Sequence, residues 1–410
     1  MSSRLRRLAL DLTPLRVSRD FRLVWIGLLI TSSGSQFTLV AVFVQVTRLT
    51  GSEAAVGVTG LAWLVGLVMG SIGGATILDA WDRRTLLVLA QIGLLAGVSV
   101  LLLGAIAGDP PLGVIYGGLA LMAACSAIDG PTRSAMTPRL LGAELVPSAQ
   151  ALNQVVWNTA GLFGPAVAGL LIVQVGVAWA YAIDLLSVVG MLVAALSIRP
   201  MPPEERDSED RGLRAIREGF SFVRRSRLLL STFVIDLIAM IFGLPRSLFT
   251  FMVADARFVG LLFSAPAVGA LVGALTSGWT RHVRRQGLAV IIAVALWGVA
   301  IAAFGWSGGH LWLALLMLAA AGWADVISAI YRSTILQVSV PDRLRGRLSG
   351  IHILVVTGGP RLGDVEAGLV AAWMTPAFSV VSGGLACIVG AGLVAFAFPE
   401  LRRYRAPSDG

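Results

Sequence analysis

WDRRTLLVLAQIGLLAGVSVLLLGAIAGDPP, residues 81–111, is the stretch that decides how this chain folds. A basic pair, Arg83 and Arg84, precedes a run without any charged side chain over residues 85–107, and a Gly-Asp-Pro-Pro turn follows it. About 20 consecutive apolar residues are enough for an α-helix to cross the hydrocarbon core of a bilayer. The stretch therefore predicts a membrane-spanning helix with arginines at one end and a short turn at the other.

The same pattern recurs along all 410 residues. The chain is 56% hydrophobic and 13% charged, with a mean hydropathy of +0.83, whereas soluble domains carry about 25% charged residues. A bilayer accepts the apolar exterior that a soluble fold of this size cannot hide. We therefore expect an all-α membrane protein with twelve spanning helices, over residues 23–46, 54–78, 85–107, 112–136, 149–174, 177–198, 228–252, 257–279, 287–306, 311–337, 348–372 and 376–398.

Arginine sets the predicted orientation, because the sequence contains no lysine. With the N-terminus in the cytoplasm, the external loops hold only Arg48 and Arg257, while the remaining loop arginines are cytoplasmic. Such an asymmetry is typical of membrane topology. We predict a multi-pass protein of the inner or plasma membrane with both termini in the cytoplasm. Since the arginines lie in short loops rather than on one polar stripe, we expect no nucleic-acid partner.

The two halves of the chain resemble each other at an offset of 199–200 residues. Arg133-Ser134 aligns with Arg332-Ser333, and GPAVAGLL from Gly164 aligns with GDVEAGLV from Gly363. Two parallel six-helix repeats predict a transport site at their interface near the middle of the bilayer. We therefore divide the chain into an N-terminal half (1–198), a cytoplasmic linker (199–227), a C-terminal half (228–398) and a cytoplasmic tail (399–410).

The segment GGATILDAWDRR, residues 73–84, resembles the cytoplasmic loop signature of the major facilitator superfamily. Ala75 and Ala80 depart from that signature. The resemblance implies a cytoplasmic gate closed by pairing of carboxylates with guanidinium groups. Alternatively the loop serves only membrane topology, and Asp129 and Arg133, which are four positions apart, form a local ion pair. The gate candidates are Asp79, Asp82, Arg83, Arg84, Asp129 and Arg133.

The segment GLFGPAVAG, residues 161–169, resembles the Gly-Pro signature of superfamily exporters. Glycine and proline bend a membrane helix, and small residues four apart allow close helix contact. The exporter-kink candidates are Gly161, Gly164, Pro165 and Gly169. The alternative is that these residues bend the helix for structural reasons only. DGPTRSAMTP (129–138) and GPRLGDVEAGL (359–369) further resemble the enterobactin-exporter-like, drug-efflux branch. This resemblance extends over nearly the whole chain and implies outward transport.

Charged residues within apolar runs are costly in a bilayer and indicate functional sites. Asp236 has no basic residue within one turn of its own helix, so we prefer it as the carrier of a coupling proton. The further proton-coupling candidates are Asp364, Glu366 and Asp325. We expect Asp184, near the external end of its helix, to reach water.

The substrate-cavity candidates are charged or polar residues that the predicted helices place within the membrane: Arg246, Arg361, Ser35 and Gln36. Arg361 and Asp364 are three residues apart, so they share a helix face. The alternative to a role in substrate binding is therefore that they neutralise each other. Serine and glutamine side chains alternatively serve only to join helices.

These features predict a secondary active transporter rather than an enzyme. We expect a proton-driven exporter that alternates access and carries a small amphipathic molecule, either a siderophore-like metabolite or a drug. Its partners would be this small molecule, protons and the lipid bilayer, and we expect a monomer. No spacing predicts a metal site, and no cofactor is expected, because an ATP-binding P-loop requires a lysine. The alternatives are an uptake symporter and a membrane sensor or scaffold that does not transport.

Overall fold

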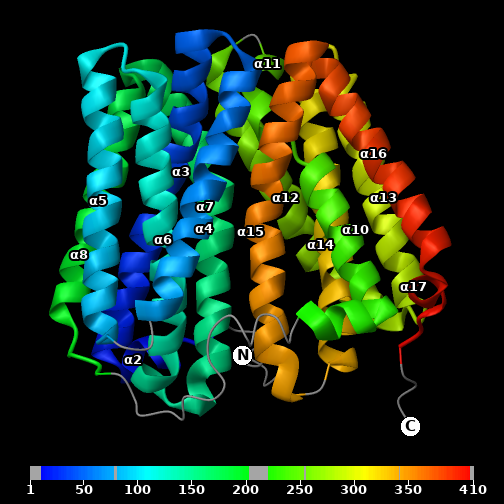
Figure 1. The fold of residues 1–410 in the computed structure, drawn as a ribbon, viewed down its shortest axis with the longest axis horizontal. Coiled ribbons are helices and arrows are strands. Elements are labelled where there is room, and N and C mark those ends of the chain that lie inside the picture. Colours follow the sequence, from blue (N-terminus) through cyan, green and yellow to red (C-terminus); the bar gives the residue numbers. More distant parts are fainter. Residues whose placement is uncertain (1–10, 78–80, 203–219, 254, 341, 407–410) are drawn as a thin grey trace, which may run out of the picture. The chain divides into compact units, whose positions relative to one another are not determined.

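The computed structural model describes residues 11–77, 81–202, 220–253, 255–340 and 342–406. Within these ranges every regular element is a helix (Figure 1). The long helices follow the order of the predicted segments: α3 (Arg19–Thr50), α4 (Glu53–Ile77), α5 (Arg83–Ala107), α6 (Leu112–Leu141), α7 (Val146–Val175), α8 (Val177–Ser197), α10 (Arg227–Phe242), α12 (Val259–Thr276), α13 (Gln286–Gly305), α14 (Leu311–Ser339), α15 (Asp342–Trp373) and α16 (Pro376–Ala397).

Short helices lie between or beside the long ones. The α-helical ones are α2 (Thr13–Val17), α11 (Phe249–Met252) and α17 (Pro399–Arg403), and the 3₁₀ turns are η1 (Ala143–Leu145), η3 (Arg246–Leu248), η4 (Ala256–Phe258) and η5 (Ser277–His282). Among the described residues, eleven helical segments are long and apolar enough to cross a membrane. α15 is not one of the eleven, although it is 32 residues long. It corresponds to the predicted span 348–372, in which several charged residues interrupt the apolar pattern.

The predicted span 228–252 is broken in the structure. α10 ends at Phe242, and Gly243-Leu-Pro245 leads into η3 and α11. Proline has no backbone N–H and disfavours the helical conformation of the residue before it, which explains the break. The indole Nε1 of Trp297 donates a 2.8 Å hydrogen bond to the carbonyl of Gly243. The break sets Arg246 and Ser247 on a turn instead of a continuous helix.

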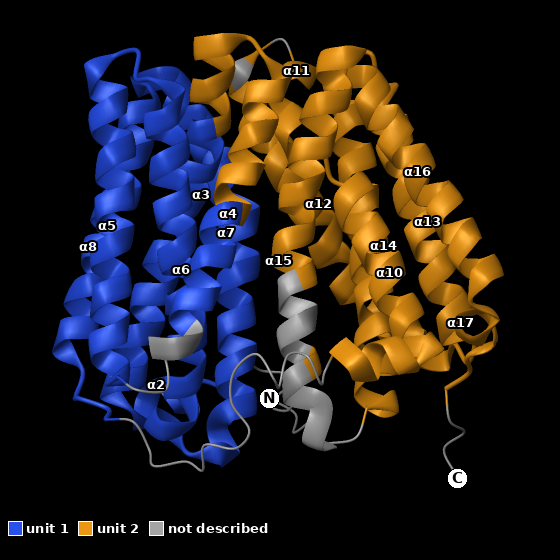
Figure 2. Cartoon of the chain, in the orientation of Figure 1, with its two compact units in different colours: residues 1–42, 65–206 blue, residues 43–64, 207–410 orange. Residues whose placement is uncertain are grey.

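The chain packs as two compact units (Figure 2). Unit 1 contains Met1–Val42 and Val65–Arg206, and unit 2 contains Phe43–Leu64 and Asp207–Gly410. The end of α3 and the start of α4 are therefore grouped with the second half of the sequence. The four predicted segments 1–198, 199–227, 228–398 and 399–410 remain predictions.

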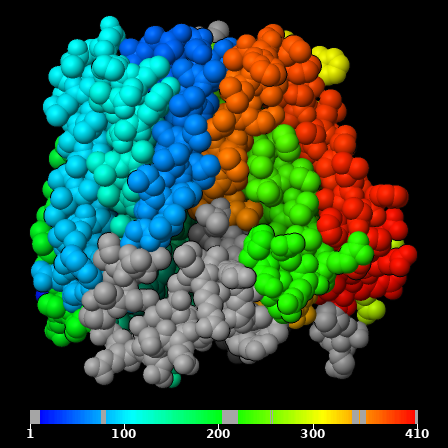
Figure 3. All heavy atoms as spheres, viewed as in Figure 1, coloured from blue at the N-terminus to red at the C-terminus, as the bar shows by residue number. Residues whose placement is uncertain are grey.

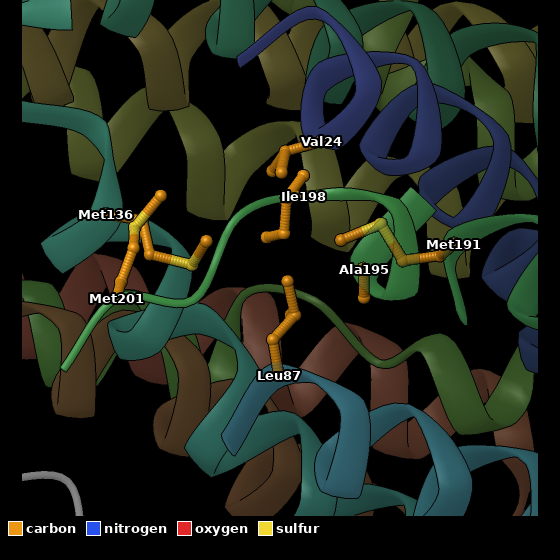
Figure 4. Packing of buried hydrophobic residues seen from close by; sticks show 7 residues of the cluster. All are labelled: Val24, Leu87, Met136, Met191, Ala195, Ile198 and Met201. Carbon is orange, nitrogen blue, oxygen red and sulfur yellow. The ribbon is translucent and has the colours of Figure 1, made fainter. Parts of the chain in front are cut away.

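Unit 1 has an apolar core where the ends of four helices meet. α5 packs against α6 and α8. Figure 4 shows side chains from α3, α5, α6 and α8 and from the segment after α8 pointing toward one another. These buried residues are Val24, Leu87, Met136, Met191, Ala195, Ile198 and Met201.

In unit 2, α13 packs against α14 and α16, and α12 packs against α14. Trp297 and Phe304 of α13 are among the largest fully buried side chains. By contrast, α16 exposes Val389, Leu393 and Phe396, and in the space-filling view this helix (red) forms part of the outer surface (Figure 3). An apolar exterior of this kind is stable in lipid rather than in water.

The short helix α2 packs against α7 in unit 1, and the carboxyl group of Asp11 lies beside it. The hydroxyl of Thr13 donates to Asp11 at 2.5 Å, and the hydroxyl of Ser148 donates at 2.7 Å. These hydrogen bonds lower the pKa of the Asp11 carboxyl below its usual value. A carboxyl with a depressed pKa in the folded state stabilises it above the pKa of the unfolded state and loses this contribution as pH falls.

We expect amide hydrogen exchange in α2 to quicken on acidification, because protonated Asp11 accepts these hydrogen bonds less well. The measurement is hydrogen–deuterium exchange of the full chain in nanodiscs, corrected for intrinsic rates. Asp11→Asn is expected to abolish this pH dependence. An equal acid response in wild type and variant would contradict the role of Asp11.

Candidate functional site

The main candidate site is a buried group of charged side chains in unit 2. Asp236 of α10 forms an ion pair with Arg332 of α14, and the two side chains are 2% and 6% exposed. The other guanidinium nitrogen of Arg332, Nη2, lies 3.6 Å from Oδ1 of Asp325, also on α14. One guanidinium group therefore faces two carboxylates. Asp325 is the looser partner, and its side chain is 35% exposed.

A pocket of about 150 Å³ adjoins the pair of Asp236 and Arg332. Thr232 and Phe233 of α10, and Ser333, Leu336 and Gln337 of α14, complete its lining. A pocket of this size that is lined by hydroxyl, amide and charged groups as well as apolar ones has room for water. The ion pair is thus buried but borders a small pocket.

α15 supplies the second part of the site. Nη1 of Arg361 lies 3.6 Å from Oδ2 of Asp364, which is fully buried. The backbone N–H of Ser247 donates to Oδ1 of Asp364 at 3.0 Å, and the Ser247 hydroxyl donates to the Asp364 carbonyl at 3.1 Å. The helix break after α10 makes these bonds available. Arg361 and Asp364 thus form the ion pair that their three-residue spacing along one helix allows.

Arg361 also contacts α4. Its guanidinium carbon lies 4.7 Å from the centre of the Trp63 ring, a cation–π geometry. A Cβ atom on Gly60 would lie 2.5 Å from the Arg361 carbonyl, and one on Gly57 would lie 2.8 Å from the Asp364 carbonyl. Backbone atoms cannot turn aside as a flexible side chain can, so these glycines allow α4 to approach α15 closely.

Arg246 of η3 joins the two parts electrostatically. It interacts with both Asp364 and Asp325, but within the described ranges it has no ion pair shorter than 4 Å. Two carboxylates thus surround Arg332, whereas Arg246 and Arg361 share Asp364. The carboxylates of Asp236, Asp325 and Asp364 thus balance the guanidinium groups of Arg332, Arg246 and Arg361 in number, and Arg246 interacts with both parts of the site.

Glu366 also lies on α15, half-buried. It interacts electrostatically with the thiol of Cys387 on α16. The four proton-coupling candidates thus lie in unit 2, and Asp236 and Asp325 share one arginine.

The predicted gate residues lie in unit 1, except that Asp79 lies outside the described residues. Asp82 caps α5 by accepting a 3.0 Å hydrogen bond from the backbone N–H of Thr85. The guanidinium of Arg84 donates to the carbonyls of Ala195 and Leu196 near the end of α8, at 3.3 and 2.6 Å. The backbone N–H of Arg83 donates to the carbonyl of Met201 at 3.0 Å. These contacts attach the start of α5 to the end of α8.

Asp129 and Arg133 form the local pair that their spacing allows. Nη2 of Arg133 lies 2.5 Å from Oδ2 of Asp129. The amide of Gln91 on α5 donates a 2.8 Å hydrogen bond to the other carboxylate oxygen. Their gating role, which the structure does not test, stays a prediction.

The remaining cavity candidates, Ser35 and Gln36, lie on α3 within unit 1. Ser35 is exposed, and its hydroxyl donates to the carbonyl of Ser32 at 3.0 Å. A Cβ atom on Gly164 of α7 would lie 2.6 Å from Cβ of Gln36. The exporter-kink segment therefore contacts α3 at Gly164, while α7 continues as one helix through the buried residues Pro165 and Gly169.

We expect Gly164→Ala to destabilise unit 1 by about 1–3 kcal/mol, the usual cost of overpacking a close contact. Gly161→Ala is the matched control, because a Cβ atom there meets no atom within 4 Å. Both variants gain the same helix propensity. The difference in melting temperature between the two variants is measured by heating each in detergent and monitoring the loss of the folded protein by size-exclusion chromatography. Equal melting temperatures for the two variants would refute a tight α3–α7 contact at Gly164.

Sequence reasoning missed several contributors. The sequence analysis named Arg332 only in the alignment of the two halves. An arginine within the predicted span 311–337 was reason enough to include it among the site candidates. Ser247 and Trp63 carry no such signal, because their roles depend on the helix break and on the α4–α15 approach. Asp184, expected to reach water, is 1% exposed, so that expectation is wrong.

Comparisons with known proteins cover nearly the whole chain. The family described as transmembrane secretion effector matches residues 9–408. The enterobactin exporter EntS of Citrobacter koseri is 30% identical over 407 residues, covering 97% of this chain and 96% of the relative. EntS of Escherichia coli O157:H7 is 30% identical over 406 residues with the same coverage.

Solved structures show the fold. A POT family transporter in complex with 5-aminolevulinic acid has a TM-score of 0.74 at 11% identity, covering 94% of this chain and 97% of the other. The nucleoside transporter NupG has a TM-score of 0.70 at 14% identity, with coverages of 94% and 100%. These likenesses confirm the expected major facilitator fold.

Proposed function

The chain belongs to the transmembrane secretion effector family of the major facilitator superfamily, and from this premise we propose that it exports a small amphipathic molecule, driven by inward proton flow. It is a multi-pass membrane transporter and not an enzyme. The observation that carries the proposed export is the full-length similarity to enterobactin exporters. The exporter would alternate access between the two sides of the membrane and act as a monomer.

The charged group in unit 2 supports proton coupling. Arg332 serves two carboxylates, so one proton can neutralise the looser of them without breaking the tighter pair with Asp236. Asp325 is the better placed acceptor, because it is farther from the guanidinium and more exposed. Its Oδ1 is buried and lacks a hydrogen-bond partner among the described residues. We therefore propose Asp325 as the proton carrier in place of Asp236.

The arginines of the same site support a substrate with an acidic group. Arg246 and Arg361 both interact with Asp364, and Arg246 also interacts with Asp325, so these two guanidinium groups are our candidates for binding an anion. Arginine stays protonated and binds planar oxyanions with two parallel hydrogen bonds. Trp63, whose ring packs against the Arg361 guanidinium, would supply apolar surface beside this anion contact. A siderophore-like metabolite with acidic groups suits these contacts better than a cationic drug.

The function is tested with a deletion strain and with everted membrane vesicles. Untargeted analysis of the culture medium, with a drug-susceptibility panel, identifies the compound that the deletion strain retains. Vesicles containing the protein are expected to accumulate enterobactin, the cargo named for its relatives, or that compound when their interior is acidic. Uptake by right-side-out vesicles instead would identify a symporter, and no flux of any released compound would favour a sensor or scaffold.

We also propose that the protein lies in the inner or plasma membrane with both termini and residues 199–227 in the cytoplasm. Ser208→Cys and Asp109→Cys, in a background without Cys125 and Cys387, form a matched pair. In intact spheroplasts an impermeant maleimide is expected to label Asp109→Cys, in a predicted external turn, and to leave Ser208→Cys unlabelled. Labelling of Ser208→Cys would overturn this topology.

A further inference from the structure

A fully buried carboxylate in unit 1 takes no part in the proposed coupling. Asp184 of α8 is 1% exposed. The hydroxyl of Thr38 on α3 lies 2.5 Å from its Oδ2, and the hydroxyl of Ser187 lies 3.1 Å from its Oδ1. A Cβ atom on Gly34 would clash with Ser187 and lie 2.8 Å from Oδ1 of Asp184. α3 and α8 are therefore in direct contact around this carboxyl group.

In the part of the chain that the structure describes, the other buried aspartates each have an arginine beside them, and Asp184 does not. Arg133 pairs with Asp129, Arg332 with Asp236, and Arg361 with Asp364. Within the described residues, the groups that interact with the Asp184 carboxyl are the two hydroxyls of Thr38 and Ser187.

The helices around Asp184 bring no charge to it. α7 has no charged residue, and α8 has no other than Asp184. The charged residues of α5 and α3 stand at the helix ends: Arg83, Arg84, Arg19, Asp20, Arg22 and Arg48. The titratable neighbour on α8 itself is Tyr181, one turn away and fully buried.

We infer that Asp184 is a second proton-binding site, separate from the charged group in unit 2, and that it holds a proton while α3 and α8 are packed together. An ionised carboxylate buried without a cation is far more costly than a neutral carboxyl group. The neutral form needs only hydroxyl partners: its carbonyl oxygen, Oδ2, accepts from Oγ1 of Thr38, and its O–H, on Oδ1, donates to Oγ of Ser187, whose own hydroxyl donates to the Asp184 backbone carbonyl. Release of the proton to water leaves a charge that requires hydration, and therefore separation of the two helices.

α3 links this site to residues of unit 2. Thr38 lies little more than one helical turn before Phe43, where the helix passes from unit 1 to unit 2. Beyond that point Phe43 stacks on Phe263 with ring centres 5.5 Å apart, and Thr47 and Thr250 share a 2.8 Å hydrogen bond. Loss of the proton at Asp184 would thus act on a helix that both units share.

Infrared difference spectroscopy of the full chain in nanodiscs tests the site without any substrate. We expect wild type to show the C=O stretch of a protonated carboxyl group at neutral pH, and Asp184→Asn to lose that band. Thr38→Val should shift the band, because it removes a hydrogen-bond partner but keeps the acid. Glu366→Gln is the control, because Glu366 is a half-buried carboxyl group of α15 for which no ion pair is found among the described residues.

Hydrogen–deuterium exchange supplies a second readout. Raising the pH is expected to increase exchange in the part of α3 around Thr38 in wild type, and not in Asp184→Asn. An unchanged carboxyl band in Asp184→Asn, or a band that Thr38→Val leaves in place unshifted, would overturn the proposal. Neither experiment depends on transport, so a failure here is distinct from a failure of the proposed export.

Discussion

Replacing Arg332 by glutamine is expected to destabilise unit 2 by about 3–5 kcal/mol, the cost of removing one partner from a buried ion pair. The change leaves the carboxylates of Asp236 and Asp325 without the guanidinium that now lies between them. Thermal unfolding in detergent, with denaturation followed by loss of the monodisperse chromatographic peak, measures the effect.

The double variant Arg332→Gln/Asp236→Asn removes charge from both partners and is expected to recover much of this loss. Coupled residues deviate from additivity by about 0.5–3 kcal/mol. Arg133→Gln is the matched control at the repeat-related position, where the pair lies within one helix and the arginine side chain is 16% exposed. It should cost clearly less than Arg332→Gln. A double variant whose loss equals the sum of the single losses would show that Arg332 and Asp236 are not coupled.

Asp325→Asn is expected to abolish accumulation driven by a pH gradient while leaving exchange of substrate across the membrane intact. The amide has nearly the shape of the acid but cannot load and release a proton, so binding and the conformational cycle should persist. The measurement is proteoliposome flux of the compound retained by the deletion strain, with and without an imposed pH gradient.

Asp236→Asn provides the comparison for this prediction. If it loses gradient-driven accumulation while Asp325→Asn keeps it, Asp236 is the carrier and the assignment to Asp325 is wrong. If both variants remain coupled, the carrier is among the remaining candidates, Asp364 and Glu366.

The membrane helices were predictable because their signal is local. Residues 85–107 contain no charge and correspond to α5, which begins at Arg83 and ends at Ala107. The break after Phe242 was also within reach, since Gly243 and Pro245 are visible in the sequence and proline interrupts helices. The overly long seventh span came from reading hydropathy without this constraint.

The partners of the buried charges were much harder to predict. The absence of a basic residue near Asp236 along its own helix said nothing about Arg332, which approaches from α14. Conversely, the position of Asp184 near the end of its helix suggested that its side chain reaches water. In the structure Gly34, which has no side chain, lets α3 pack closely over it. Spacing along one helix predicted pairs such as Arg361 with Asp364, but contacts between helices depend on packing that a single sequence does not encode locally.

Proton movement coupled to substrate flux tests the proposed function most directly. Proteoliposomes that enclose a pH-sensitive dye and an acidic interior are mixed with the compound retained by the deletion strain. We predict that the compound accumulates inside as the interior becomes less acidic, and that Asp325→Asn shows neither change. Accumulation of the compound by wild type with no proton leaving the interior, or equal accumulation without a pH gradient, would contradict proton-driven export.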